Sequence, residues 1–313
     1  MKFAFVFPGQ GSQAVGMMAA YLTADGDDSV LHDTFAEASA ELGFDLWDMV
    51  ANGPADALNQ TVNTQPAMLA AGVAVYRLWL ARGGAVPALM AGHSLGEYTA
   101  LTCAGALDFT DAIRLVRLRA EAMQSAVPEG VGAMAAVLGL DDDGVRAACA
   151  EAAQGEVLEA VNFNSPGQVV IAGNKAAVER GMVLAKEKGA KRALPLPVSV
   201  PSHCALMKPA AEKLRAALAV LEVRVPSVPV LHNADVAAHD SAEAIRDALA
   251  RQLFSPVRWV ESMFALRDQG VQLIAECGPG KVLAGLNKRT LEIPTLAMAD
   301  AAALADVLAK STA

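Results

Sequence analysis

The chain has 313 residues, of which 54% are hydrophobic and 19% are charged, so it is long enough to bury a sizeable core and is not disordered as a whole. Its 25 Lys and Arg residues against 34 Asp and Glu residues give a formal net charge of −9, and no basic tract stands out. This balance makes the chain a poor candidate for wrapping nucleic acid.

The cysteines and the apolar runs indicate a reduced, cytoplasmic protein. The four cysteines lie far apart with no CxxC pair, which argues against a disulfide framework and against a structural zinc site. The apolar run Ala67–Tyr76 stops at Arg77 and is too short to span a bilayer. The run Met1–Phe7 leads into a Pro-Gly turn, so it predicts a first strand and not a secretion signal.

The first predicted strand, residues 2–7, is followed by the loop Pro8-Gly9-Gln10-Gly11-Ser12-Gln13. The loop resembles a phosphate-binding turn, but Ala14 stands where GxGxxG needs its third glycine. The Walker pattern also fails, because Val282 follows Gly280-Lys281. The glycines of the loop still allow its backbone N–H groups to approach a negative charge.

Helices and a short strand are expected in the next part of the chain. In order, they are a helix over about 30–43, a helix over 66–82, a strand over 88–91, a helix over 97–104 and a helix over 111–126. Pro66 fits the first turn of the second helix, and Gly83 lies just past its end. Thr110 is expected to cap the last of these helices.

Residues 128–198 show a different succession of predicted strands and helices. The expected elements are strand 133–138, helix 141–153, strand 157–161, strand 168–172, a helix capped by Asn174 that runs to 188, and strand 191–196. This βαββαβ order is that of a ferredoxin-like module. We predict a small ferredoxin-like α+β domain over 128–198, inserted into a large, discontinuous α/β catalytic domain made of 1–127 and 199–313.

Strands and helices alternate again after this insert. The expected elements are helix 205–221, strand 228–231, helices near 241–253 and 257–269, strand 271–275, a helix from 281, and an Ala-rich tail. The alternation predicts a hydrolase-like α/β fold with a mostly parallel, helix-covered sheet.

The sequence Gly92-His93-Ser94-Leu95-Gly96 is a GxSxG motif between a strand and a helix, which is the setting of a nucleophile elbow. The glycines allow a sharp turn that lifts the Ser94 hydroxyl clear of the sheet. The start of the helix offers free N–H groups, so the Leu95 N–H is a candidate oxyanion donor. The alternative is an ordinary strand–turn–helix junction with Ser94 as the helix cap.

His203 is the preferred general base among the histidines, because it lies at the exit from the predicted small domain, where clefts form. His232 is the second choice, and the alternative for His203 is a polar loop residue. His93 is expected to have a structural role in the turn. His32 and His239 are expected to face solvent. No acidic residue stands out as the third member of a Ser-His-acid triad. Glu276, at the end of a predicted strand, is the best of several weak candidates.

Arg119 is a cation on the apolar face of the predicted helix 111–126, one turn from Leu115 and from Met123. Burying a guanidinium costs several kcal/mol unless it is paired. Two explanations stay open. One is an internal salt bridge, which the helix position alone favours; the other is a carboxylate that arrives with a substrate, which an Arg fork binds bidentately.

These motifs together resemble the malonyl-CoA:acyl carrier protein transacylases of fatty-acid synthesis. The resemblance covers nearly the whole chain, with no departure at a motif position. Its segments are Gly9-Gln10-Gly11-Ser12-Gln13, Gly92 to Glu97, Arg119, Met134-Ala135-Ala136, Asn162 to Gln168, Pro201-Ser202-His203, Gln252-Leu253 and Glu276 to Gly280.

The resemblance implies a role for each matching residue. It places the nucleophile on Ser94, the base on His203 and the binding of the substrate carboxylate on Arg119. The remaining implied site positions are the backbone oxyanion donors Gln10 and Leu95, the substrate-binding positions Gln10 and Asn162, and Gln252 near the main-chain carbonyl that orients the base. The implied fold is a hydrolase-like α/β domain with a ferredoxin-like insert.

The implied reaction is a ping-pong transfer of malonyl from malonyl-CoA, through a malonyl-serine, to the phosphopantetheine thiol of a holo acyl carrier protein. It needs no bound metal or cofactor, no nucleic acid and no membrane. Carriers of this pathway are acidic, so a local basic patch must overcome the repulsion between two acidic proteins. The candidates are Lys186, Lys188, Lys191 and Arg192, and Lys281, Lys288 and Arg289 in the expected last helix. The alternative for each of them, favoured for any single residue, is an ordinary solvated surface.

Three alternatives stay open. The chain could be a serine esterase or thioesterase, although a neutral-ester hydrolase has no use for Arg119 on an apolar face. It could be a transacylase for a polyketide or malonate-decarboxylase carrier. It could also be a non-catalytic module that docks carriers, against which the presence of Ser94, His203 and Arg119 argues.

Overall fold

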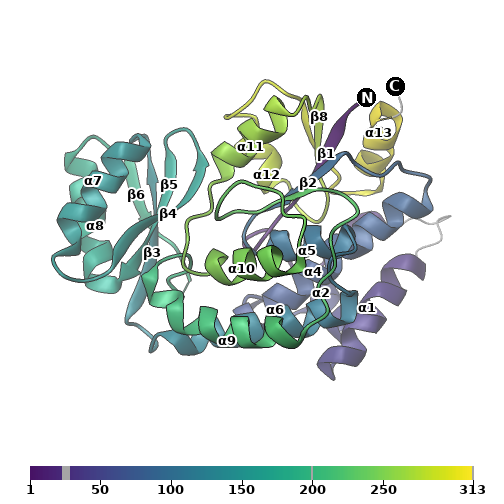
Figure 1. The fold of residues 1–313 in the computed structure, drawn as a ribbon, viewed down its shortest axis with the longest axis horizontal. Helices are drawn as coiled ribbons and strands as arrows, with labels where there is room; N and C mark the ends of the chain where they lie inside the picture. The colour runs from purple at the N-terminus through teal and green to yellow at the C-terminus, as the bar shows by residue number, and fades with distance from the viewer. Residues whose placement is uncertain (23–28, 199, 312–313) are drawn as a thin grey trace.

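Two separate β-sheets organise the chain in a computed structural model, which describes residues 1–22, 29–198 and 200–311 (Figure 1). The first sheet is parallel, in the order β7-β2-β1-β8-β9, and the second is antiparallel, in the order β4-β5-β3-β6. The parallel strands are β1 (Phe3–Phe7), β2 (Leu89–Gly92), β7 (Val230–Leu231), β8 (Leu273–Glu276) and β9 (Thr295–Ala297). The antiparallel strands are β3 (Gly132–Leu138), β4 (Leu158–Ser165), β5 (Gln168–Asn174) and β6 (Arg192–Pro195). The predicted fold class is confirmed.

The central strand of the parallel sheet, β1, is buried along its whole length. Its phenylalanines pack into one apolar cluster, whereas Ala4 and Val6 pack into a second cluster on the opposite face. This explains its continuous apolar sequence. In the register of β1 with β2, Phe7 pairs with Gly92. The loop after β1 and the GxSxG turn after β2 therefore meet at the carboxyl edge of the sheet, where α/β folds place their ligands.

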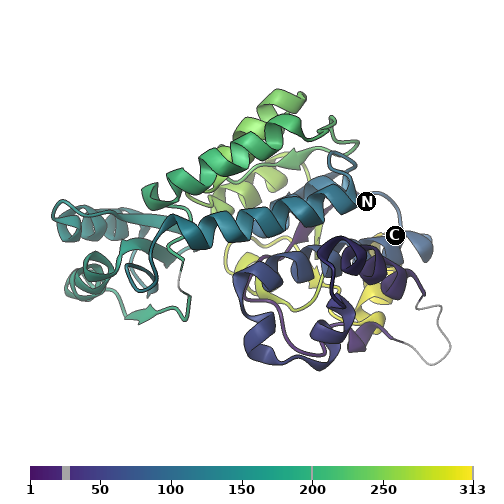
Figure 2. The ribbon, with the colours of Figure 1, turned by 90° about the horizontal axis from the view of Figure 1, so that it is seen from below.

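Helices surround the parallel sheet (Figure 2). They are α1 (Ser29–Leu42), α2 (Leu46–Asn52), α3 (Ala55–Leu58), α4 (Thr61–Ala81), α5 (Leu95–Cys103), α6 (Phe109–Ala126), α9 (Lys208–Val220), α10 (Ala242–Gln252), α11 (Trp259–Asp268), α12 (Val282–Asn287) and α13 (Ala301–Ser311). Helix α6 packs between α4 and α9. Among the described residues, none of the helices combines the length and apolarity needed to cross a membrane.

The predicted start of α4 is wrong. The helix begins at Thr61, and Pro66 lies inside it. Gln60 has an extended backbone, and the Thr64 N–H already donates to its carbonyl oxygen. Pro66 therefore removes a single backbone hydrogen bond from a helix that is already formed and almost fully buried, and the packing outweighs that loss. The earlier start also brings Gln65 into the helix.

Several predicted ends differ as well. Helix α6 is capped by Asp108, whose carboxylate accepts from the Thr110 N–H, because an Asp placed just before the helix competes successfully with the Thr hydroxyl. Asn174 stands at the start of α8 (Lys175–Glu187), but its side chain accepts from the Val157 N–H instead of capping the helix. The short helices α2 and α3 were not predicted. The Ala-rich tail contains β9 and α13, so α12 is not the last helix.

The antiparallel sheet lies at one end of the molecule (Figures 1 and 2). Its chain order, β3-α7-β4-β5-α8-β6 with α7 at Asp142–Ala153, is the predicted βαββαβ order. Strand β4 continues to Ser165, beyond its predicted end, and so includes Asn162 and Asn164. Val257, just before α11, exchanges backbone hydrogen bonds with Val161 and Phe163 of β4. This contact joins β4 to the helices around the parallel sheet.

Candidate active site

The GxSxG turn is a sharp elbow that only glycine permits at its two ends. A Cβ at Gly92 would lie 1.9 Å from the Gly96 backbone, and one at Gly96 would lie 2.0 Å from the Phe7 carbonyl oxygen. Ser94 has φ 51° and ψ −108°, a conformation that residues other than glycine rarely adopt. Its hydroxyl makes no capping bond to α5 and faces a cavity instead. The reading of Ser94 as an ordinary helix cap is therefore wrong.

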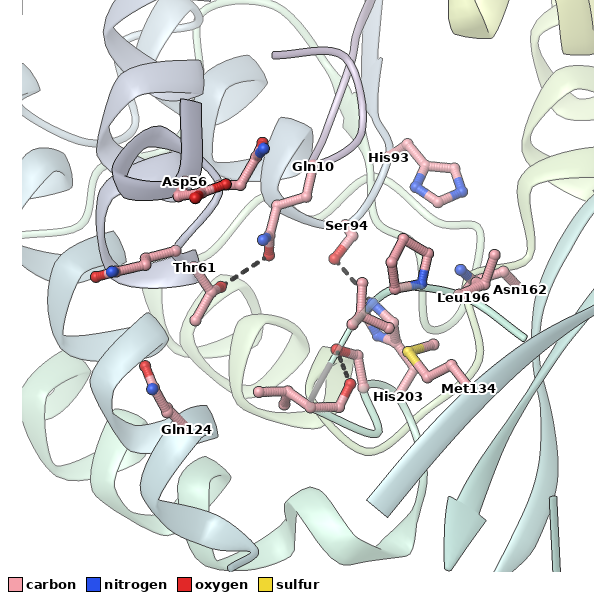
Figure 3. A pocket seen from close by; sticks show the side chains of 16 residues that line it. Gln10, Asp56, Thr61, His93, Ser94, Gln124, Met134, Asn162, Leu196 and His203 are labelled. Carbon is pink, nitrogen blue, oxygen red and sulfur yellow. Dashed lines mark hydrogen bonds between the residues drawn. The ribbon is translucent and has the colours of Figure 1, made fainter. Parts of the chain in front are cut away.

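His203 lies directly opposite the Ser94 hydroxyl (Figure 3). Its Nε2 is 2.8 Å from Ser94 Oγ, and its Nδ1 is 2.8 Å from the main-chain oxygen of Gln252. Burial, and then the nearby Arg119 guanidinium, lowers the pKa of His203 to about 3. The ring is therefore neutral at pH 7. With the proton on Nδ1 donated to the carbonyl, the lone pair of Nε2 accepts from the Ser94 hydroxyl.

The other histidines have different partners. The His232 Nδ1 is 2.7 Å from Glu97 Oε1, in the buried interior behind the elbow. The His93 Nε2 is 2.7 Å from Asn164 Oδ1, on the side of the antiparallel sheet. The remaining two differ in exposure: His32 is exposed, as expected, whereas His239 is half-buried against Asp235.

Glu276 is not part of a triad. Its carboxylate accepts from the backbone N–H groups of Leu283 (3.1 Å) and Ala284 (2.8 Å), and it thereby serves the start of α12. Burial raises the pKa of Glu276 to about 7. Because a main-chain carbonyl occupies the orienting position beside His203, the prediction for Glu276 is wrong.

Arg119 is fully buried, and each of its hydrogen-bond partners is neutral. Nη1 donates to Gln65 Oε1 at 2.8 Å, while Nη2 donates to Ser94 Oγ at 3.2 Å and to Gln252 Oε1 at 3.1 Å. The guanidinium carbon lies 5.2 Å from the centre of the Tyr98 ring. Within the described residues, no carboxylate forms an ion pair with Arg119, and its Nε has no partner. The hypothesis that Arg119 is paired in an internal salt bridge is therefore wrong.

Gln65 was missed in the sequence analysis. A helix with Pro66 in its first turn places Gln65 in the preceding loop, where a polar side chain needs no explanation. With α4 beginning at Thr61, Gln65 is a polar residue on an almost wholly apolar, buried helix. A polar side chain in that position is the signal that would have identified it.

Glu97 and Asn233 were also missed, and both support the elbow. The Asn233 Oδ1 accepts from the Ser94 N–H at 2.7 Å, and its Nδ2 donates to the Gly92 carbonyl at 2.7 Å. Glu97 is 0% exposed, in an apolar stretch directly after the motif. A carboxylate in an apolar stretch predicts a buried acid with hydrogen-bond partners, so the sequence position of Glu97 could have identified it. Asn233, which follows a two-residue strand, carried no such signal.

The loop after β1 packs directly against the elbow. A Cβ at Gly9 would lie 2.5 Å from the His93 carbonyl oxygen and 3.7 Å from the Leu95 nitrogen. The next residue, Gln10, lines the cavity, and its Oε1 accepts from Thr61 Oγ1 at 3.1 Å (Figure 3). The backbone of this loop thus lies against the start of α5, and Gln10 and Ser94 both line the cavity.

A cavity of about 410 Å³ opens over the Ser94 hydroxyl. One side is polar and comes from the β1 loop and α3–α4: Gln10, Asp56, Asn59, Gln60 and Thr61. The other side is more apolar and includes Met134, Asn162, Leu196, Val198 and Val200, from the antiparallel sheet and the segment after it. The Oδ1 of Asn162 is buried, with no partner among the described residues. The volume suits a small ligand or the end of an extended arm.

The arrangement has the parts of an acyl-transfer site. A serine hydroxyl lies against a neutral histidine, and a buried cation without a carboxylate partner lies beside that hydroxyl. Among the described residues, no group of three or more His, Cys, Asp and Glu side chains is placed to hold a metal ion. The side chains present therefore support nucleophilic catalysis on a substrate that carries a negative charge.

Comparison with known proteins agrees with this chemistry. The sequence pattern of the acyl transferase domain matches residues 4–310. A malonyl CoA-acyl carrier protein transacylase of Escherichia coli (strain K12) is 59% identical over 294 residues, covering 94% of each chain. The protein of the same name from Bacillus subtilis (strain 168) is 44% identical over 301 residues, covering 96% of this chain and 94% of that one.

Solved structures are also similar. An acyl carrier protein S-malonyltransferase from Vibrio cholerae O1 biovar eltor has a TM-score of 0.95 at 59% identity, covering 98% of this chain and all 100% of the other. A malonyl-transacylase in complex with its type II PKS acyl-carrier protein, in the holo form, has a TM-score of 0.97 at 56% identity. That likeness covers 99% of this chain and 100% of the other.

Proposed function

The chain belongs to the acyl transferase domain family, and from this premise we propose that it transfers the malonyl group of malonyl-CoA to the phosphopantetheine thiol of an acyl carrier protein in fatty-acid synthesis. The observation that carries the proposal is the Arg119 guanidinium, 3.2 Å from Ser94 Oγ and without a carboxylate partner. A malonyl group differs from an acetyl group by a free carboxylate, which an arginine fork binds bidentately.

The first half-reaction acylates Ser94. Its Oγ attacks the thioester carbonyl carbon of malonyl-CoA while the hydroxyl proton moves to Nε2 of His203. The C–S bond then breaks, and His203 returns the proton to the departing CoA sulfur. The main-chain oxygen of Gln252, which accepts from Nδ1–H, stabilises the imidazolium between these two steps.

The second half-reaction runs the same steps in reverse with a new thiol. His203 accepts the proton of the carrier's phosphopantetheine thiol, and the sulfur attacks the ester carbonyl. The bond to Ser94 Oγ breaks, and the proton returns to the hydroxyl. Because both thioesters use one serine in turn, the kinetics are ping-pong.

The developing oxyanion is assigned to the backbone N–H groups of Gln10 and Leu95. The packing of the Gly9 loop onto the elbow supports this pair, because it brings the backbone next to Gln10 close to the Leu95 nitrogen. Removing one donor of such a pair typically costs about 3 kcal/mol of transition-state stabilisation.

Binding of the malonyl carboxylate is assigned to Arg119, whose guanidinium is held by neutral amide oxygens and is not already paired with an acid. An acyl group held in this way leaves the in-line approach to the incoming thiol and not to water. The side chains of Gln10 and Asn162, which line the cavity, are assigned to the remainder of the substrate.

An acidic carrier would dock on the basic end of the antiparallel sheet. Lys191 packs on Gly139, whose N–H donates to the Gly167 carbonyl at 2.7 Å, and Arg289 donates to Gln168 Oε1 at 2.7 Å. Lys191 and Arg289 are both exposed. They come from the two predicted basic groups, residues 186–192 and 281–289, and they lie at the same end of the antiparallel sheet. A local patch of this kind offsets the repulsion between two proteins of negative net charge, and the association should weaken as salt is added.

A polyketide carrier is a second candidate for the acceptor. The structural neighbour solved with a type II PKS acyl-carrier protein is 56% identical to this chain, so its acceptor differs from that of fatty-acid synthesis without a change of fold. A cytoplasmic location belongs to the same proposal and is supported by four free cysteines. The two-domain division at 128–198 is also proposed, with the two separate sheets as its support.

Intact-mass measurement tests the reaction. The purified protein with malonyl-CoA should gain one malonyl group per chain, and holo carrier protein should then remove it and carry it. Ser94→Ala should gain none. An adduct that persists in Ser94→Ala would place the nucleophile elsewhere, and an adduct lost to water faster than to the carrier would favour the thioesterase.

A further inference from the structure

A single carboxylate, Glu97, lies at the centre of the hydrogen bonds behind Ser94. Its Oε1 accepts from His232 Nδ1 at 2.7 Å. Its Oε2 accepts from the Asn233 N–H and from Gln252 Nε2, both at 2.8 Å. An ionised carboxylate has only acceptors, so each of these partners must present a hydrogen to it. Glu97 therefore decides how three neighbouring groups are oriented.

Gln252 links this carboxylate to Arg119. Its Nε2 donates to Glu97 Oε2 and, at 3.0 Å, to the Ser94 carbonyl, while its Oε1 accepts from Arg119 Nη2 at 3.1 Å. A reversed amide would place its oxygen against two acceptors and its NH2 against a cation. The Glu97 carboxylate thus holds Gln252 in the orientation that offers its oxygen to the guanidinium.

The second amide on the same guanidinium has no such anchor. Gln65 Oε1 accepts from Arg119 Nη1 at 2.8 Å, but its Nε2 donates to the neutral Thr61 hydroxyl at 3.1 Å. Two glutamines therefore hold one arginine, and only one of them is bound to a buried anion. This difference supplies a matched control within the chain.

We propose that Glu97 is a positioning residue for malonyl selectivity, which acts through Gln252 to aim Arg119 at the substrate carboxylate. The inference rests on the proposed function. A carboxylate in direct contact with Arg119 would occupy the fork that the substrate needs. One amide placed between the two charges orients the guanidinium and leaves it without an ion-pair partner.

Glu97→Gln tests the proposal, because it removes the charge and keeps the shape. Neutral His232 can carry its proton on either ring nitrogen, and its Nε2 has no partner among the described residues. With the proton on Nε2, the His232 Nδ1 can accept a hydrogen bond from the new amide NH2 of residue 97. The protein should therefore fold. The ratio of kcat/KM for malonyl-CoA over acetyl-CoA should fall about tenfold, the effect of weakening one hydrogen bond to a charged group.

The two glutamines separate a positioning role from a structural one. In a Gln252→Ala background, Glu97→Gln should change the ratio less than about twofold, whereas in a Gln65→Ala background it should keep its about tenfold effect. Gln252→Ala leaves the main-chain carbonyl that His203 needs. An unchanged ratio in Glu97→Gln, a raised ratio, or equal effects in both backgrounds would overturn the proposal.

A readout without substrate keeps this test distinct from the proposed function. The side-chain amide protons of Gln252 should be protected from hydrogen exchange in the wild type and should exchange at least about tenfold faster in Glu97→Gln. If malonyl-CoA fails to acylate the wild type, the proposed function falls while this measurement still tests the anchor. If Glu97→Gln does not fold, Gln252→Ala must lower the selectivity ratio more than Gln65→Ala, and the reverse order or equality overturns the proposal.

Discussion

The two ends of the same cavity are built differently. At its inner end, His203 lines the cavity and Arg119 lies next to Ser94; they are 2% and 0% exposed, and each makes polar contacts that fix its orientation. At its outer end, Leu196 and Val198 present apolar side chains, and Val198 is 46% exposed. The inner end is organised before substrate arrives, whereas the outer end only has to admit a long arm. Substitutions at the two ends should therefore differ in size and in kind.

His203→Ala should have the largest effect, because it removes the neutral imidazole that we propose as the base. The rate of acylation by malonyl-CoA should fall by about 10³-fold, as expected for loss of a positioned proton acceptor. Quenched-flow intact-mass measurement of the malonyl-enzyme gives this rate. His32→Ala, at an exposed position of α1 that does not line the cavity, is the control and should be close to wild type. A loss below tenfold would mean that the inner end is not where the proton is transferred.

Arg119→Ala should come next and should change selectivity as well as rate. The kcat/KM for malonyl-CoA should fall by about 10²-fold, while the value for acetyl-CoA should change little, because only the malonyl group carries a carboxylate for the fork. Arg119→Lys keeps the charge without the fork and should be intermediate. Equal losses for both thioesters would identify Arg119 as a structural cation.

The pH dependence of stability tests the burial of His203. Its pKa is lowered to about 3 in the folded protein, from 6.5 in the ordinary group, so the folded state binds fewer protons than the unfolded state between these values. His203 should therefore destabilise the fold as pH falls below 6.5, by at most about 1.4 kcal/mol per pH unit. Urea unfolding of the wild type and of His203→Gln at pH 8 and pH 5.5 measures this contribution.

The sign of that effect distinguishes His203 from Glu276. The raised pKa of Glu276, about 7 against an ordinary 4.5, makes stability fall as pH rises through that window. Relative to His203→Gln, the wild type should lose free energy of unfolding at the lower pH. A difference between the two proteins that does not change with pH would contradict a buried, neutral imidazole.

Val198→Ser should have the smallest effect, because it changes an exposed apolar side chain at the outer end. The free energy of unfolding should change by no more than about 0.5 kcal/mol. The KM for the carrier should rise by a factor of about two to five if the apolar wall guides the phosphopantetheine arm, with acylation by malonyl-CoA less affected. An effect as large as that of Arg119→Ala would remove the distinction between the two ends.

Local patterns were sufficient for much of the architecture and for part of the site. The apolar run of β1, the alternation of strands and helices, and the βαββαβ order of the second sheet all follow from side-chain spacing, and each is confirmed. The glycines around Ser94 identified the elbow, because no other residue fits that turn. Arg119 stood out because a cation on an apolar helix face needs an explanation.

The errors arose where a short-range signal competed with packing. Pro66 suggested a helix start, but a buried helix tolerates the loss of one hydrogen bond. Thr110 suggested a cap, although Asp108 is the residue that caps the helix. Glu276 suggested a triad acid because acids at strand ends often serve catalysis, but the nearest donors are the backbone N–H groups at the start of α12.

Residues close together in the chain were enough to predict most of the elements, the elbow and the need for a partner at Arg119. The identity of those partners depends on how distant segments pack. Gln65, Arg119 and Gln252 come from three helices far apart in sequence, and no periodicity encodes which polar groups meet when apolar faces pack. The result is a cation held by amides and not by an acid, which long-range packing alone could establish.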